Sequence, residues 1–103
     1  MVIISIVSYL PEQSKEVAKR FGELPPLPSY MTIKGPYFSG EVGAGVKAII
    51  IYEFDQTKTR EAMEYVGTRL AKYFGVPGFT YSANIWLEVK EVLVAIKTGP
   101  RMA

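Results

Sequence analysis

The sequence predicts a single α+β domain in which two helices cover one face of a four-stranded antiparallel sheet. Strand-like and helix-like segments follow one another in the order βαββαβ, which is typical of an α+β sandwich. The chain has 103 residues, enough for one core, and 49% of them are hydrophobic. We therefore expect one domain over residues 1–103.

The first half of the chain predicts a strand, a helix and a second strand. Residues 2–9 are rich in β-branched side chains, which favour a strand. Pro11 suits the first turn of a helix, and the prolines within residues 24–28 end that helix because they remove backbone donors. Residues 30–40 predict a strand in which Gly35-Pro36 marks a bulge or an edge position.

The second half predicts a strand, a helix, another strand and a terminal helix. Residues 46–54 are the strongest strand of the chain, and Asp55 or Thr57 is expected to cap the helix that follows. Residues 79–88 alternate as a strand does, whereas residues 89–97 have helical spacing. The buried face of the main helix is predicted to hold Ala62, Val66 and Leu70. This order predicts a ferredoxin-like sandwich with a short C-terminal helix.

Both faces of the predicted sheet are apolar, although two helices cover only one of them. The first strand places Ile4 and Ile6 on one side and Ile3 and Val7 on the other. A second apolar face requires a cover, and the simplest cover is the same surface of a second copy. We therefore expect a homodimer.

The sequence resembles the dimeric α/β-barrel superfamily in four respects. These are the order of the elements, the length, central strands that are apolar on both faces, and the C-terminal appendage. Residues 24–28, 35–37, 52–54, 61–65 and 75–81 also resemble an uncharacterised prokaryotic family of that type. The resemblance implies a ferredoxin-like fold that pairs into a dimeric α/β barrel. It admits cofactor-independent monooxygenase or isomerase activity. Haem- and oxygen-handling members commonly use histidine, and this chain has none, so no residue role is transferred.

Composition narrows the classes of function. The formal net charge is +2, which provides little electrostatic attraction, so neither nucleic acid nor a membrane is expected as a partner. The sequence contains no Cys and no His, so we expect no metal and no cofactor. The N-terminal apolar run is too short to span a bilayer, and we expect a cytoplasmic protein.

The glycines of residues 40–47 do not form a phosphate loop. The lysine of such a loop directly follows a glycine and precedes Ser or Thr, whereas Lys47 does neither. This segment also leads into a predicted strand and offers no helix N-terminus to a phosphate. We expect a hairpin turn at residues 41–45.

The polar stripe of the last strand is the most informative local feature. Ser82, Asn84 and Trp86 alternate with apolar residues that should meet the helices, so the stripe should point toward the partner or a cavity. We expect a mainly apolar cavity between the facing sheets of the dimer. Its predicted polar or aromatic lining is Ser5, Glu53, Ser82, Asn84 and Trp86.

Three functions stay open. The first is a module that binds a small apolar or aromatic ligand. The second is a cofactor-independent enzyme of the monooxygenase or isomerase kind, in which Glu53 and Asn84 would act. This hypothesis ranks lower because the chain has no His, no Cys and no catalytic motif. The third is a structural or regulatory dimer without a ligand.

Overall fold

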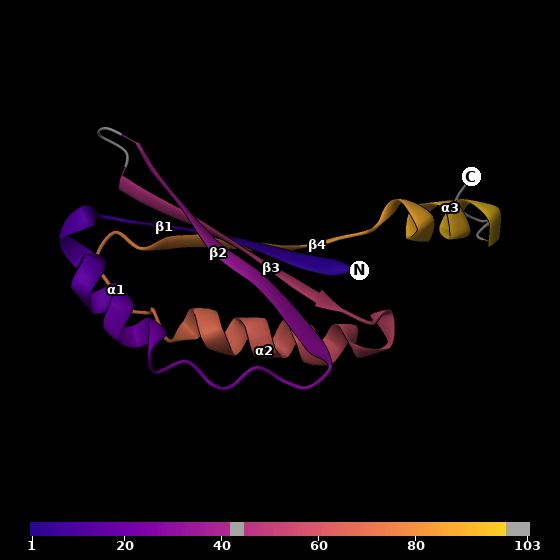
Figure 1. Ribbon diagram of the computed structural model, residues 1–103, viewed down its shortest axis with the longest axis horizontal. Helices are drawn as coiled ribbons and strands as arrows, with labels where there is room; N and C mark the ends of the chain where they lie inside the picture. The colour runs from indigo at the N-terminus through magenta and orange to yellow at the C-terminus, as the bar shows by residue number, and fades with distance from the viewer. Residues whose placement is uncertain (42–44, 99–103) are drawn as a thin grey trace.

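The computed structural model describes residues 1–41 and 45–98, in which α1 and α2 cover one face of a sheet and α3 lies beyond its end (Figure 1). The strands are β1 (Val2–Tyr9), β2 (Met31–Glu41), β3 (Gly45–Phe54) and β4 (Thr80–Trp86). The helices are α1 (Ser14–Phe21), α2 (Thr59–Ala71) and α3 (Val89–Thr98). The sheet is antiparallel in the order β2-β3-β1-β4. The predicted α+β class is confirmed, and the arrangement is consistent with a ferredoxin-like sandwich.

Local sequence signals set the helix starts. The Asp55 carboxylate accepts hydrogen bonds from the Thr57 backbone N–H at 2.9 Å and from its hydroxyl at 2.7 Å, which confirms Asp55 as a cap. This cap opens a 3-10 turn, Gln56–Lys58, that leads into α2. The first helix also begins as a 3-10 turn, Pro11–Gln13, because the Gln13 N–H bonds to the Leu10 carbonyl oxygen at 2.9 Å.

Strand β2 lies at one edge of the sheet and has an irregular register. Its pairing with β3 shifts between Lys34 and Tyr37, so the predicted bulge at Gly35-Pro36 is confirmed. Gly35 has a φ of 93°, and a Cβ there would lie 2.8 Å from the Ile49 carbonyl oxygen. Glycine is therefore required at this point. At the far end of the hairpin, Glu41 pairs with Gly45; the predicted turn includes residues 42–44, which lie outside the described residues.

The main core lies between α2 and the sheet. Ala62, Val66 and Leu70 are all buried, as the helical spacing predicts. The other buried members come from the strands: Ile3, Val7, Met31, Ala48, Tyr52 and Phe54.

The packing is thinner under α1. This helix has eight residues and buries only Val17, while Phe21, one turn further on, is 45% exposed. Val17 joins a smaller cluster in which Tyr73 stacks on Phe79 with ring centroids 4.8 Å apart. The sheet near α1 is therefore incompletely covered.

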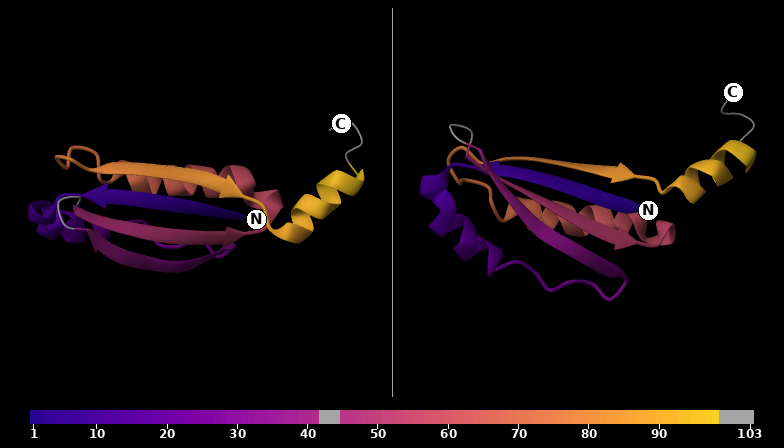
Figure 2. Two further views of the ribbon diagram at one scale, coloured as in Figure 1. Left: turned by 90° about the horizontal axis from the view of Figure 1, so that it is seen from above. Right: turned by 45° about the horizontal axis from the view of Figure 1, so that its top comes forward.

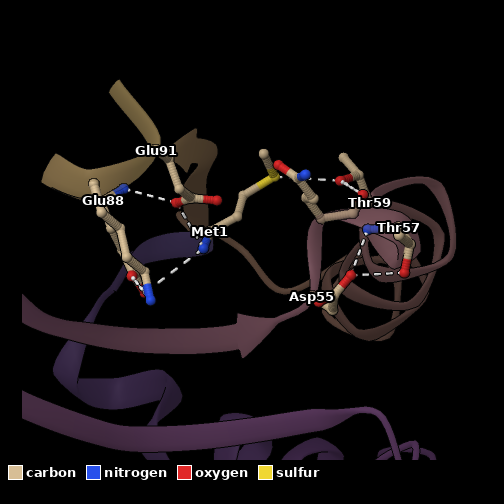
Figure 3. A network of polar contacts seen from close by, with 8 residues as sticks. Met1, Asp55, Thr57, Thr59, Glu88 and Glu91 are labelled. Atoms are coloured by element: carbon tan, nitrogen blue, oxygen red, sulfur yellow. Dashed lines mark hydrogen bonds and ion pairs between the residues drawn. The ribbon is translucent and has the colours of Figure 1, made fainter. Parts of the chain in front are cut away.

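Helix α3 extends away from the sheet and confirms the predicted terminal helix (Figure 2). Its first turn is held by the start of the chain, where the Met1 amino nitrogen lies 2.8 Å from Glu91 and 3.7 Å from Glu88 (Figure 3). The Met1 sulfur also lies 3.2 Å from the Thr59 hydroxyl oxygen, so one residue links α3 to α2. No helix within the described residues combines the length and the apolar character that a membrane span needs.

Candidate functional site

A cavity of about 430 Å³ lies between the sheet, α1 and the C-terminal end of α2. Most of its wall is apolar or aromatic and includes Val7, Val17, Ala48, Ile50, Leu70 and Phe79. Phe21 and Phe38 also line it and are 45% and 64% exposed, so they mark the side that is open to solvent. The space exists because the short α1 does not fill the groove over the sheet. Its volume is that of a small-molecule site.

Ser5 belongs to the wall of this apolar space, and its hydroxyl is fully buried without a partner. Ser5 is in the middle of β1, is 0% exposed, and lines the cavity. Its Oγ atom has no hydrogen-bond partner. A buried polar group left unpaired costs about 1–3 kcal/mol, so such groups are rare in native proteins. The hydroxyl therefore marks a place where a bound molecule can supply the missing hydrogen bond.

Three tyrosines lie in the cavity wall: Tyr9, Tyr52 and Tyr73. Tyr52 of β3 is 1% exposed, and Tyr73 follows α2 and is also buried. Burial raises the pKa of the Tyr52 and Tyr73 phenols, and the nearby positive charge of Arg69 opposes part of that rise. Both side chains are therefore neutral at physiological pH, and each has a hydroxyl that can donate or accept a hydrogen bond.

Arg69 brings a guanidinium group from α2 to the same cavity. It is only 7% exposed, and its Nη1 donates a hydrogen bond to the Tyr65 Oη at 3.2 Å. Its Cζ lies 5.6 Å from the centre of the Tyr52 ring and 5.8 Å from that of Tyr65. Tyr65 is itself fixed, because its hydroxyl donates to the Pro25 carbonyl oxygen at 2.9 Å. These contacts hold the guanidinium in one position.

The structure separates the predicted site residues onto two faces. Along β1, Val2 pairs with Glu53 and Trp86, Ile4 pairs with Asn84, and Ile6 pairs with Ser82. The four partner residues therefore share the face that no helix covers, which we call the open face. Ser5 lies between Ile4 and Ile6, so strand alternation turns it to the helix-covered face. Its predicted grouping with the other four residues is wrong.

Glu53 has an ordinary environment at the end of its strand. Its carboxylate lies 3.5 Å from the Lys34 ammonium group across the β2–β3 pair, and both side chains are substantially exposed. Exposed pairs of this kind contribute little to stability. The arrangement is that of a solvated strand end.

Sequence reasoning missed Arg69, although the sequence carries a signal for it. Position 69 is three residues after Val66 and seven after Ala62, which places it on the buried face of α2. A charged residue at such a position is unusual and deserves a search for its partner. Tyr52 lies in the predicted strand over residues 46–54, and no pattern in the sequence indicates that it borders a cavity.

The chemistry of the cavity is that of hydrogen-bond donors on an apolar wall. Among the described residues that line it there are hydroxyl groups and one guanidinium, and no carboxylate. The described part of the chain also contains no group of three or more Asp or Glu side chains placed to hold a metal ion. Groups of this kind are suited to orienting a ligand by hydrogen bonds rather than to acid–base chemistry with carboxylates.

A comparison with protein-family models finds no match for this chain, and a comparison with curated proteins finds none either.

Proposed function

We propose that the protein binds a small, mainly apolar or aromatic ligand in the cavity between the sheet, α1 and α2. The observation that carries the proposal is the unpaired, fully buried hydroxyl of Ser5, a residue in the wall of an apolar space of about 430 Å³. Ligand sites commonly combine an apolar wall with a few polar groups that fix orientation. A ligand with one polar end would pair with Ser5 while its body displaces water from the apolar wall.

The proposed ligand site lies inside one protomer, whereas the sequence predicted a site between the facing sheets of a dimer. This location also changes the enzyme hypothesis, because Glu53 and Asn84 lie on the open face. Neither residue can act on a ligand inside this cavity. Binding is therefore the better-supported function. The lack of cysteine fits a reducing compartment, and a cytoplasmic location belongs to the same proposal.

The test uses a neutral bicyclic probe and a variant that closes the cavity. We expect 2-naphthamide to shift the backbone amide NMR signals of Ser5 and Ala48. Ala18 of α1 lines the cavity and is exposed, so Ala18→Trp should place a ring in the space and abolish the shifts. Lys19→Trp is the matched control, because Lys19 is on the same helix but not in the cavity wall. Unchanged signals with both neutral and anionic naphthalene probes would refute the proposal, as would equal binding to Ala18→Trp.

We further propose that the open face pairs with the same face of a second copy. Ile6 and Ile49 are adjacent at its centre and are 37% and 36% exposed, with Ile4 and Ile51 beside them. Lys34 and Glu53 form an ion pair on the same face. An apolar centre beside charges of both signs is self-complementary under two-fold symmetry. Trp86, 53% exposed, lies on the outermost strand of this face.

A further inference from the structure

We infer that the cavity takes an organic monocarboxylate with an apolar or aromatic body, and that Arg69 is the group that binds its carboxylate. This inference rests on the proposed ligand-binding function and adds the chemical class of the ligand. The observations that carry it are the charge of Arg69, its burial and the lack of a protein counterion.

Arg69 is a buried cation without an anionic partner among the described side chains. In residues 1–40 and 45–97 no carboxylate oxygen lies within 4.0 Å of its guanidinium nitrogens. The neighbouring arginine pairs on helices are different, since Arg20 contacts Glu16 at 2.8 Å and Arg60 contacts Glu64 at 3.0 Å. Buried charges in proteins are normally paired. A negative charge that pairs with Arg69 would therefore come from a molecule bound in the cavity.

The Arg69 guanidinium has more N–H donors than hydrogen bonds among the described residues. Among the described residues, the guanidinium donates one hydrogen bond within 3.5 Å, from Nη1 to the Tyr65 hydroxyl, and the Tyr52 hydroxyl is its second polar neighbour. A guanidinium presents parallel N–H donors that match the two oxygens of a carboxylate. The Tyr52 and Tyr65 rings restrict how the guanidinium plane can turn, because both ring centres lie within 6 Å of the Cζ atom. The guanidinium is therefore preorganised for a bidentate contact.

The remaining cavity favours a single negative charge at one end of an apolar molecule. The described lining has hydroxyls of Ser5 and Tyr73 that can donate to an anion, and no carboxylate that would repel one. One positive charge balances a monocarboxylate, whereas a phosphate dianion would leave a buried excess charge. The apolar wall provided by Val7, Ala48 and Leu70 fits the body of the ligand.

The competing explanation is that Arg69 only supports the fold, through Tyr65 and the two tyrosine rings. That role gives no preference between a charged and a neutral ligand. The two explanations therefore differ in a ratio of affinities that the unmodified protein can report.

The experiment compares 2-naphthoate with its neutral analogue 2-naphthamide by calorimetric titration at neutral pH. We expect the wild-type protein to bind the acid about tenfold to a hundredfold more tightly, as charge-assisted hydrogen bonds are about twice as strong as neutral ones. Equal affinity for both probes would overturn the inference while the proposed ligand-binding function stands. No binding of either probe would refute both.

Variants then assign the preference to Arg69. Arg69→Met should remove the preference for the acid, so that the affinities for the two probes lie within about threefold of each other. Arg60→Met is the matched control on the exposed side of α2 and should keep the preference. Retention of the preference in Arg69→Met would overturn the assignment. If Arg69→Met does not fold, Arg69→Lys keeps the charge but not the fork of donors, and a lower ratio than wild type is expected.

Discussion

At the scale of single residues, the interior of this protein holds polar groups that the described residues satisfy only in part or not at all. Ser5 and Arg69 reach the cavity from β1 and α2, two elements far apart in sequence. Each is more than nine-tenths buried. In a fold whose function was only structural, an alanine and an aliphatic residue would pack there at lower cost. Their presence is most simply explained by a ligand.

Ser5→Ala should therefore stabilise the ligand-free protein. The variant removes a buried hydroxyl that has no partner, so the free energy of unfolding should rise by about 1 kcal/mol. Urea denaturation at 25 °C measures the change. Ser8→Ala is the control on the same strand, and its effect should stay within about 0.5 kcal/mol. A loss of stability in Ser5→Ala would show that the hydroxyl is satisfied in solution, contrary to our interpretation.

At the scale of elements, the turns are set by backbone conformations that few residues adopt. Gly45 begins β3 with a φ of 92°, and a Cβ there would lie 2.6 Å from the Tyr9 carbonyl oxygen. Because that contact is with backbone, a side chain cannot be accommodated by a rotamer change. Gly67 lies within α2 with nothing within 4 Å of the corresponding Cβ position.

The two glycines should respond to alanine in opposite directions. Gly45→Ala should lower the free energy of unfolding by about 1–3 kcal/mol, through backbone strain. Gly67→Ala should raise it by about 0.5–1 kcal/mol, because alanine loses less conformational entropy in a helix. Chemical denaturation of both variants at one temperature checks the pair. A stable Gly45→Ala protein would contradict the backbone conformation described for this turn.

Helix α3 depends on the contact between Met1 and Glu91. The hydrogen bond from the Met1 amino group, followed by that from the Glu88 backbone N–H, holds the pKa of Glu91 below its usual value of 4.5. A carboxylate with a lowered pKa in the folded state stabilises that state fully above 4.5, and the contribution is lost as pH falls through the folded value.

Glu91→Gln should therefore lower the melting temperature at neutral pH, and the difference from wild type should shrink as the pH falls below 4.5. Circular dichroism melts from neutral to acidic pH measure it. Glu12→Gln, an exposed change in the first 3-10 turn, is the control for the loss of one carboxylate. A constant difference at every pH would exclude the ion pair as the cause.

At the scale of the whole molecule, the sheet has one face covered by helices and one face without a cover. The open face carries isoleucines from both central strands, β1 and β3. Beyond its end, α3 adds apolar side chains such as Val89, which is 77% exposed. Two apolar surfaces on one molecule of this size favour self-association.

A charge at the centre of the open face should prevent dimerisation. We expect the wild-type protein to sediment as a dimer at about 0.1 mM, and Ile49→Lys to sediment as a monomer because burying its ammonium group is unfavourable. Thr80→Lys, at the end of the same face beside Ser8, should remain dimeric. Analytical ultracentrifugation separates these outcomes. A wild-type monomer at this concentration would remove the support for the dimer.

The sequence predicted the elements well because the signals for them are local. The alternation in β4, the spacing of Ala62, Val66 and Leu70 and the bulge at Gly35-Pro36 each depend on a few neighbouring residues. The cavity depends on how far α1 stands from the sheet, which no local pattern encodes. Alternation along the first strand puts Ser5 on the same side as Ile3 and Val7, but it does not say which of the two apolar sides the helices cover.

The irregular register of β2 limits how the sheet can grow. An added strand needs an unbroken row of backbone donors and acceptors along the edge it meets. At β2 that row is interrupted between Lys34 and Tyr37, and Pro36 has no amide hydrogen to offer. The opposite edge, β4, pairs with β1 in regular steps from Thr80 to Trp86. Edge-to-edge polymerisation needs two receptive edges in each copy, so an irregular β2 is a poorer edge than β4 for extending a chain of sheets.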